Sequence, residues 1–334
     1  MPKRFAFPIL TILIVLGAYS AYWFYARGQI ETYVRDWEAA QVEAGYTIER
    51  DGPVRVGGFP YRFSVAADNV VMRAPASEGG WELRLASFEA DALPYDFSHW
   101  IVSLGETFQL ESGGEGLSFT AGEARFSIAT RDGVTQRIGA EIAALTIEPI
   151  GGADSAITAL GDLRLNAGTS EDGIMAVQIQ MTGIDLDTDA IDPVMADAFG
   201  DHVGLLRADF TLSQWPELAR TASLSSWSQA EGIYTLRAFQ LDWGRLDMDA
   251  EGQMSLDEQL RPTGRLSLTL LDPEAIVDAM IEAGAVSEDN SGALRLVAQS
   301  APRNDNGTAI PLSFRNGGVF FGPVRLGSVG PVLR

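Results

Sequence analysis

Polar and apolar positions alternate strictly in the segment GRLDMDAEGQMSLD, from Gly244 to Asp257. Every even position from Leu246 to Leu256 is apolar or small, whereas the odd positions from Asp247 onward are polar. A period of two is typical of a β-strand with one face in water and the other in an apolar environment. A turn region and the alternating segment GRLSLTLL follow, and together they predict an antiparallel hairpin.

Several other segments share this alternation, so the sequence predicts a mainly β body. They include GGFPYRFSV, WELRLASF, EARFSIAT, EIAALTIEP and IMAVQIQM. In the first of these, Gly58 permits an unusual backbone turn, and Pro60 restricts Phe59 to an extended conformation. Near the end of the chain, Asn316-Gly317 stands between two apolar runs in FRNGGVFF, which is a strong hairpin signal.

Short helices interrupt the strands. DAIDPVMADAFG predicts one at about Pro193–Phe199, and SQWPELAR predicts another with Ser213 as its N-cap. The clearest is DPEAIVDAMIEAG, in which Asp272 caps the helix and Gly284 ends it. One-sided strands crossed by amphipathic helices indicate an α+β fold that is mainly β, with antiparallel curved sheets or a half-open barrel.

The N-terminus carries a membrane-anchor signal. Lys3 and Arg4 precede an uncharged run from Phe5 to Ala26, whose 22 residues are enough to cross a bilayer core of roughly 30 Å. Tyrosine and tryptophan gather at the far end of the run, as in an interfacial aromatic belt. We expect one uncleaved transmembrane helix in the inner membrane, with the N-terminus in the cytoplasm and the bulk of the chain in the periplasm. The alternative is a signal peptide cleaved after Ser20, because Ala18 and Ser20 have the spacing that a signal peptidase requires.

The chain is therefore expected to have three parts. Residues 1–27 form the cytoplasmic tip and transmembrane anchor, and residues 28–45 form an amphipathic juxtamembrane helix. Residues 46–334 form the β-rich periplasmic domain. Within it, paired strands followed by a helix occur twice, which indicates two similar halves of about 46–200 and 201–334.

Composition argues against several classes of function. The net charge of -21 repels phosphate backbones, so nucleic acid is not expected as a partner. The chain has no cysteine, and its two histidines, His99 and His202, lie far from any nucleophile motif. The acidic segment DLDTDAID resembles the start of a calcium loop, but Ala190 within it and Ala196 after it stand where such a loop needs glycine and glutamate. We expect a protein that is not an enzyme, with no catalytic residue, no bound metal and no cofactor.

The apolar strand faces provide the candidate site. Methionine is flexible and polarisable, so it suits an adaptable apolar lining, but it also serves as an ordinary core residue. The candidate lining for an apolar ligand is Met175, Val177, Ile179, Met181, Leu246, Met248, Met254, Leu256 and Met280. The candidate structural motifs are Gly58, Phe59 and Pro60 before one strand and Trp243 and Gly244 before another.

Three segments carry a resemblance to a known family: GGFPYRF, LDWGRLDMDAEGQMSLDEQLRPTGRLSLTLLDPEAIVDAMIEAG and NGGVFFGPVRLGSVGPVLR. Over nearly the whole chain, the sequence resembles a family of single-span envelope proteins of Gram-negative bacteria known only as a domain of unknown function. The C-terminal G-x-L-x-L pattern is similar to that of the AsmA-like proteins. That resemblance implies a β-rich, lipid-handling fold at the inner membrane, in a chain too short to bridge a periplasm.

Two functional hypotheses follow. The first is a membrane-anchored periplasmic module that binds or shields lipid acyl chains in the cell envelope. The second is an envelope scaffold or protein-interaction domain with no ligand site. The expected partners are the inner membrane through the N-terminal helix, and lipid or envelope proteins. An open apolar surface on the folded protein favours the first hypothesis, and a closed core favours the second.

Overall fold

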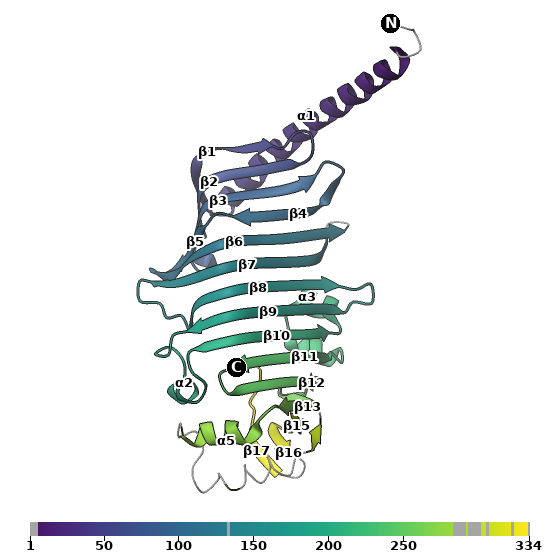
Figure 1. The fold of residues 1–334 in the computed structure, drawn as a ribbon. Helices are drawn as coiled ribbons and strands as arrows, with labels where there is room; N and C mark the ends of the chain where they lie inside the picture. Colours follow the sequence, from purple (N-terminus) through teal and green to yellow (C-terminus); the bar gives the residue numbers. More distant parts are fainter. Residues whose placement is uncertain are drawn as a thin grey trace. The chain divides into compact units, whose positions relative to one another are not determined.

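The computed structural model describes residues 6–131, 134–282, 292, 302–304, 307–321 and 324–332. The chain begins with one continuous helix, α1 (Ala6–Glu43), which passes through Gly28 without a break (Figure 1). Its part from Leu10 to Glu43 is long and apolar enough to cross a membrane. The side chains from Leu10 to Leu16 are exposed, as expected for the apolar run found in the sequence.

The chain divides into two compact units. The first contains Met1–Val134 and Glu148–Ala153, and the second contains Thr135–Ile147 and Asp154–Arg334. Strand β7 (Val134–Ile150) contributes residues to both. Each unit is built on antiparallel strands.

The first unit contains six paired strands. They are β1 (Thr47–Gly57), β2 (Phe63–Arg73), β3 (Trp81–Leu93), β4 (Asp96–Leu104), β5 (Thr107–Ser112) and β6 (Glu115–Arg131), with the short 3-10 helix η1 (Ala76–Glu78) between β2 and β3. β1 pairs with β2, and β2 pairs with β3. β3 then pairs with β4 along one half and with β5 along the other, and both of these pair with β6.

The core of the first unit lies between α1 and the sheet. Trp23 is 2% exposed and stacks on the buried Phe63, with ring centroids 4.9 Å apart. Ala26, Val56, Val65 and Ala90 complete the same buried cluster. Because a buried aromatic pair removes a large apolar area from water, this contact fixes α1 on the sheet.

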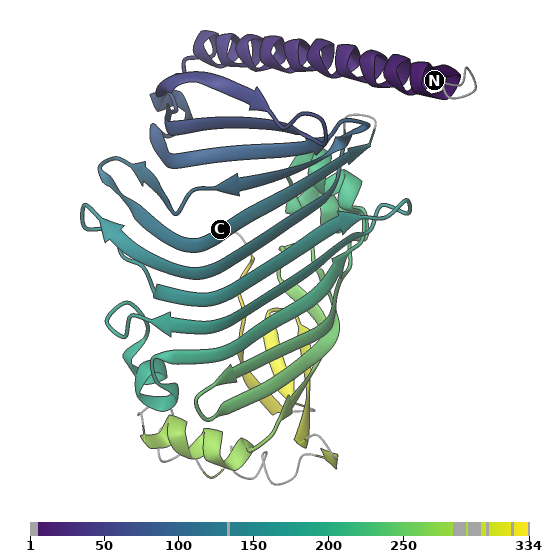
Figure 2. The ribbon, with the colours of Figure 1, turned by 45° about the horizontal axis from the view of Figure 1, so that its top comes forward.

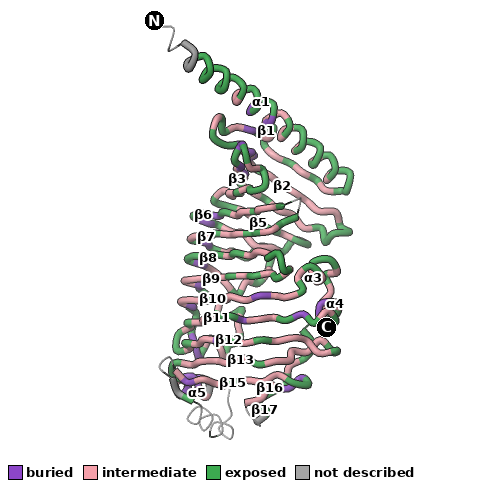
Figure 3. The backbone as a smooth tube through the Cα atoms, turned by 90° about the vertical axis from the view of Figure 1, so that its right-hand side faces the viewer, coloured by how far each residue is buried: buried purple, intermediate pink, exposed green. Residues whose placement is uncertain are grey.

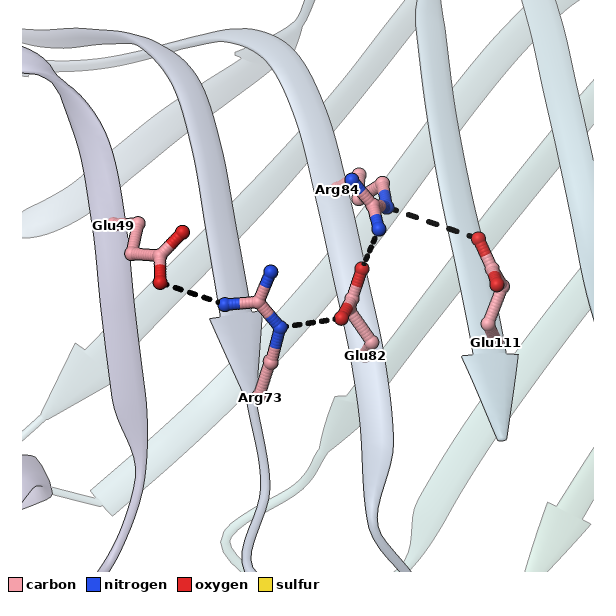
Figure 4. Close-up of polar contacts among 5 residues, drawn as sticks. All are labelled: Glu49, Arg73, Glu82, Arg84 and Glu111. Atoms are coloured by element: carbon pink, nitrogen blue, oxygen red, sulfur yellow. Dashed lines mark hydrogen bonds and ion pairs between the residues drawn. The ribbon is translucent and has the colours of Figure 1, made fainter. Parts of the chain in front are cut away.

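A ladder of ion pairs crosses β1, β2, β3 and β5 (Figure 4). Arg73 Nη1 lies 2.9 Å from Glu49 Oε1, and the Arg73 guanidinium also pairs with Glu82. Glu82 contacts Arg84, whose Nε lies 3.7 Å from Glu111 Oε1. Since opposite charges across neighbouring strands attract and like charges repel, this alternation favours the observed strand order.

The second unit contains an open antiparallel sheet whose strands are curved (Figure 2). Besides β7, its strands are β8 (Ile157–Thr169), β9 (Met175–Leu186), β10 (His202–Leu212), β11 (Tyr234–Trp243), β12 (Leu246–Leu256), β13 (Pro262–Leu270), β14 (Arg303–Asn304), β15 (Gly307–Arg315), β16 (Gly318–Phe321) and β17 (Val324–Ser328). From β7 to β13, each strand pairs with the next. β13 pairs with β15, β15 with β14 and β16, and β16 with β17.

Helices connect some of these strands. They are α2 (Pro193–Phe199), α3 (Trp215–Thr221), α4 (Leu224–Gln229) and α5 (Pro273–Glu282). Asp272 caps α5 as predicted, and the expected helix end at Gly284 lies outside the described residues. The prediction for Ser213 is wrong, because Gln214 is the N-cap residue of α3. The Ser213 hydroxyl instead accepts a hydrogen bond from the Ile233 backbone N–H at 2.8 Å.

Two predicted hairpins are present. β12 and β13 pair without a register shift, from Met248 opposite Leu270 to Leu256 opposite Pro262. Asn316-Gly317 forms the two-residue turn between β15 and β16, with φ of 50° and 70°, as a type I′ turn requires. The predicted fold class is confirmed: the protein is mainly β, with one long apolar N-terminal helix, an antiparallel curved sheet that does not close into a barrel, and few helices.

Candidate apolar ligand-binding face

Seven strands of the second unit place apolar residues directly opposite one another. One row across β8 to β13 and β15 consists of Leu165, Ile179, Ala208, Phe239, Ala250, Leu268 and Ile310. The neighbouring row consists of Ala167, Val177, Phe210, Leu236, Gly252, Leu266 and Leu312. Residues opposite one another in antiparallel strands point to the same side of the sheet. The two rows therefore form one continuous surface, the apolar face.

A register shift keeps β11 in this pattern. Leu236 lies opposite Gly252, whereas Phe239, three residues later, lies opposite Ala250, and the register shifts between the two pairs. Strict alternation would send Phe239 to the polar side of the sheet. A β-bulge adds one residue to the strand, so both large side chains belong to the apolar face.

The middle of the apolar face is not sealed by the described part of the chain. In the two rows only Ala250 and Leu236 are buried, at 7% and 8% exposed, and the other members are partly exposed. In Figure 3, residues of intermediate exposure are frequent along β8 to β13. In a sheet packed under a second layer, the central side chains would be the most buried. The two rows therefore form a surface that water still reaches.

The two ends of the apolar face are more enclosed than its middle. At one end a row of buried residues consists of Leu145, Leu160, Ile184 and Val203. Trp243, opposite Val203, packs against Phe199 of α2 with ring centroids 5.4 Å apart. At the other end Trp227 of α4 is buried and donates a hydrogen bond from Nε1 to the Ser213 carbonyl oxygen at 2.6 Å. Helices thus cover the ends of the strands and leave the middle open.

A depression of about 740 Å³ lies on β11, β12, β13 and β15 at the level of the second row. Each strand contributes one residue of the second row, namely Leu236, Gly252, Leu266 or Leu312, and the residues directly before and after it, most of which are polar. Sequence neighbours in a strand point to opposite sides of the sheet, so this depression lies on the polar side and is not part of the apolar face. The volume falls within the range of about 300–1,000 Å³ that is usual for small-ligand sites.

The structure brings several of the predicted lining residues together. Met175 and Met254 belong to one row, joined through Leu212 and Tyr234. A second row joins Met181 to Met248 through Leu206 and Leu241. All four methionines are partly exposed.

The other predicted lining residues have different positions. Val177 and Ile179 stand in the two middle rows. Leu246 packs at the end covered by α2 and α5, and Leu256 lies opposite Pro262 at the far end of β12. The side chain of Met280 lies outside the described residues.

The predicted structural motifs occupy tight backbone positions. Gly58 has φ 96°, and a Cβ there would lie 2.6 Å from the carbonyl oxygen of Arg62. Trp243 donates a hydrogen bond from Nε1 to the Gly200 carbonyl oxygen at 2.9 Å. Gly244 has φ 57° and lies so close to α2 that a Cβ would stand 2.2 Å from the Phe199 carbonyl oxygen. Phe59 and Pro60 belong to the turn before β2, where they contact α1.

Sequence reasoning missed the aromatic members of the apolar face. Phe210 belongs to the alternating segment LLRADFTL, whose pattern is a usable strand signal. Its ring lies 5.3 Å from that of Tyr234, and burial raises the pKa of the Tyr234 phenol. A phenol with a raised pKa stays neutral at physiological pH, so this end of the face keeps its apolar character.

The two histidines lie apart from the apolar face. His202 Nδ1 is 2.7 Å from Asp185 Oδ1, and both side chains are exposed. His99 is exposed on β4 of the first unit. Among the described residues, no group of three or more histidine, cysteine, aspartate or glutamate side chains is placed to hold a metal ion.

These features define a class of β-rich proteins that combine one candidate membrane-spanning helix with a one-sided apolar sheet. Residues 23–330 match the family described as "Uncharacterized protein conserved in bacteria (DUF2125)", and the chain belongs to that family. No curated protein and no solved structure matches the chain. The family match confirms the resemblance to a domain of unknown function, whereas the AsmA-like resemblance stays a prediction.

Proposed function

We propose that the protein is a membrane-anchored module of the bacterial cell envelope that binds or shields lipid acyl chains on its apolar face. The observation that carries the proposal is the pair of apolar rows, which cross seven strands and whose members, except Leu236 and Ala250, stay partly exposed. Leaving apolar area in water costs roughly 25 cal/mol per Å². A large apolar surface that a folded protein nevertheless leaves open is typical of a binding site.

The chemistry of the apolar face suits a flexible hydrocarbon chain. Its rows carry aliphatic and aromatic side chains, and the methionine pairs Met175/Met254 and Met181/Met248 stand on either side of the middle rows. Methionine has several rotatable bonds, so such positions can adapt to chains of different conformation. The proposed role is binding rather than catalysis, because the hydrocarbon part of an acyl chain has no reactive group.

The proposed location follows from α1. By the positive-inside rule, Lys3 and Arg4 favour a cytoplasmic N-terminus. A single span then leaves both units in the periplasm. The exposed apolar side chains from Leu10 to Leu16 support a helix surrounded by lipid. The AsmA-like resemblance implies the same place, the inner membrane facing the periplasm.

The test uses the full chain in nanodiscs and a photoactivatable fatty acid supplied in solution. After irradiation and digestion, we expect label on peptides of β9, β11 and β12. The double variant Met248→Asp, Met254→Asp is expected to lose this label while its circular dichroism stays that of the parent, because these side chains are partly exposed. The matched control, Asp247→Ser with Asp249→Ser, changes the other side of the same strand and is expected to keep the label.

A different result separates this proposal from the scaffold hypothesis. If the two methionines belong to a sealed core, each introduced carboxylate costs several kcal/mol and the double variant unfolds. Unfolding of the double variant, together with an unlabelled parent, contradicts acyl-chain binding and favours an envelope scaffold.

A further inference from the structure

The sheet of the first unit meets α1 before the uncharged run of the helix ends. That run extends to Ala26, which is itself buried in the first unit. Tyr22 Oη donates a hydrogen bond to the Pro94 carbonyl oxygen at 2.7 Å, and Tyr19 Oη donates one to the Pro60 carbonyl oxygen. From Tyr19 to Ala26 the helix rises by about 10 Å. The turns that contain these prolines are therefore docked beside the last part of the uncharged run.

These two turns expose aromatic side chains. Phe59 and Tyr61 in the first turn are 46% and 82% exposed, and Tyr95 and Phe97 at the second are 84% and 40% exposed. Phe59 also stacks on Phe24 of α1, with ring centroids 5.7 Å apart. Exposed aromatic side chains, some with polar tips, beside the end of a span have the composition of an interfacial belt. We call the segments 59–61 and 95–97 the interfacial turns.

A cavity of about 520 Å³ lies between α1 and the strands β2, β3 and β4. Tyr25, Ile30 and Val34 line it from the helix, and Val65 and Trp100 line it from the sheet. The helix residues that line it begin within the uncharged run. Val34, at the other limit, lies about 12 Å beyond the end of that run along the helix axis. The cavity therefore extends from the candidate membrane interface into the first unit.

We propose that this cavity binds an acyl chain of a phospholipid drawn from the bilayer that holds α1. The inference rests on the proposed anchoring, and it concerns a site in the first unit that is separate from the apolar face. A chain that leaves the bilayer beside Tyr22 stays in contact with apolar side chains up to Val34. Phospholipid acyl chains surround a membrane helix at this level, and the interfacial turns place the opening of the cavity beside them.

The lining favours a hydrocarbon chain over a polar ligand. Its polar side-chain groups are the tyrosine hydroxyls, the exposed Gln29 and the Trp100 indole N–H, which already donates a hydrogen bond to the Phe97 carbonyl oxygen at 3.0 Å. A polar ligand buried here would lose hydrogen bonds to water that this lining does not replace. Tyr25, Tyr33 and Trp100 offer broad ring surfaces, which a methylene chain can contact without any directional bond.

The experiment uses the full chain in vesicles of phosphatidylethanolamine and phosphatidylglycerol that contain a phospholipid with a diazirine in its acyl chain. After irradiation, mass spectrometry is expected to find label between Gln29 and Val34 and at Trp100, beyond the uncharged run. Val34→Trp fills the cavity and is expected to lose most of the label at Trp100. Thr32→Trp adds the same ring to an exposed position one helical turn or less away, and it is expected to keep the label.

Each contrary result overturns the proposal. Label confined to the uncharged run in the parent protein shows that no acyl chain enters the cavity. If Val34→Trp keeps the circular dichroism of the parent and Trp100 is still labelled, the acyl chain lies outside the cavity. If Val34→Trp unfolds, Ile30→Trp takes its place in the same test. If the cavity residues carry no label and native mass spectrometry finds a dimer, the cavity is instead a contact surface for a second copy of the protein. Co-flotation with vesicles tests the anchoring separately, and label from dissolved fatty acid tests the apolar face separately.

Discussion

Gly252 of β12 lies directly opposite Leu266 of β13, and a Cβ at Gly252 would stand 2.2 Å from the carbonyl oxygen of Arg265. The same hairpin holds a second close approach, because a Cβ at Gly264 would stand 2.2 Å from the carbonyl oxygen of Gln253. Their φ angles, 151° and 148°, lie outside the range that other residues adopt easily. Glycine at both positions lets the backbones of β12 and β13 approach each other closely.

Replacing Gly252 is expected to damage this hairpin. Gly252→Ala places a methyl group against a backbone carbonyl that cannot rotate away, so the strands must separate or bend. We expect a loss of about 1–3 kcal/mol in the free energy of unfolding, measured by chemical denaturation. The control is Gly327→Ala in β17, where an added Cβ meets no atom within 4 Å. Equal stability of the two variants would contradict the close approach.

The turn between β15 and β16 is expected to respond differently at its two positions. Both Asn316 and Gly317 have positive φ, but asparagine tolerates this region and most other residues do not. Gly317→Ala is therefore expected to lower the free energy of unfolding by about 1 kcal/mol. Asn316→Gly is expected to change it by less than about 0.5 kcal/mol. Equal destabilisation by both substitutions, in denaturant titrations, would be evidence against a type I′ turn.

Asp257 is expected to give the protein a pH-dependent stability. The Arg261 guanidinium, with Nε 2.8 Å from Asp257 Oδ2, holds the pKa of this carboxyl below its ordinary value, and the backbone N–H groups of Gln259 and Arg261 act in the same direction. Since the folded pKa is lower than the unfolded one, the contribution is present above the unfolded pKa of about 3.9. It disappears as the pH falls through the folded pKa.

The corresponding variant is Asp257→Asn, studied by thermal unfolding across pH. Its melting temperature is expected to lie below that of the parent at pH 7, and the difference is expected to shrink steadily below a pH of about 4. Glu258→Gln removes the same charge from the neighbouring exposed residue and serves as the control. A difference for Asp257→Asn that stays constant with pH would show that geometry rather than charge is responsible.

Much of the fold could be predicted from periodicity, because the signal is local. The alternation at Leu246–Leu256 and the Asn316-Gly317 turn specify their strands without help from distant residues. Ser213 shows where this fails, because its hydroxyl binds the N–H of Ile233, twenty residues away in sequence, instead of capping the next helix. A cap and a long-range hydrogen bond need the same side-chain oxygen, and only the folded chain decides between them.

The candidate site could be predicted only in part, for two physical reasons. The first is the register shift in β11, which brings Leu236 and Phe239 to one face although their spacing breaks the period of two. The second is that alternation predicts an apolar side without saying what covers it. Met248 would have the same sequence pattern under a second layer of structure as on an open face, so its partial exposure had to come from the structure.

The ion-pair ladder yields a last prediction, which concerns salt. Arg73 stands between Glu49 on β1 and Glu82 on β3, so Arg73→Gln removes attraction to both neighbours. Their contacts raise the pKa of the Arg73 guanidinium, with the Glu82 hydrogen bond as the largest cause, so the arginine keeps its charge at every pH of interest. The side chains are partly exposed, so the effect is small, and we expect the melting temperature to fall by about 1–2 °C at low ionic strength. At 1 M salt the Debye length is about 3 Å, and the difference is expected to vanish.

Arg207→Gln, on an exposed position of β10, removes an arginine charge outside the ladder and is the control. A melting-temperature difference for Arg73→Gln that persists at high salt would show that packing of the arginine stem, not charge, holds these strands in order.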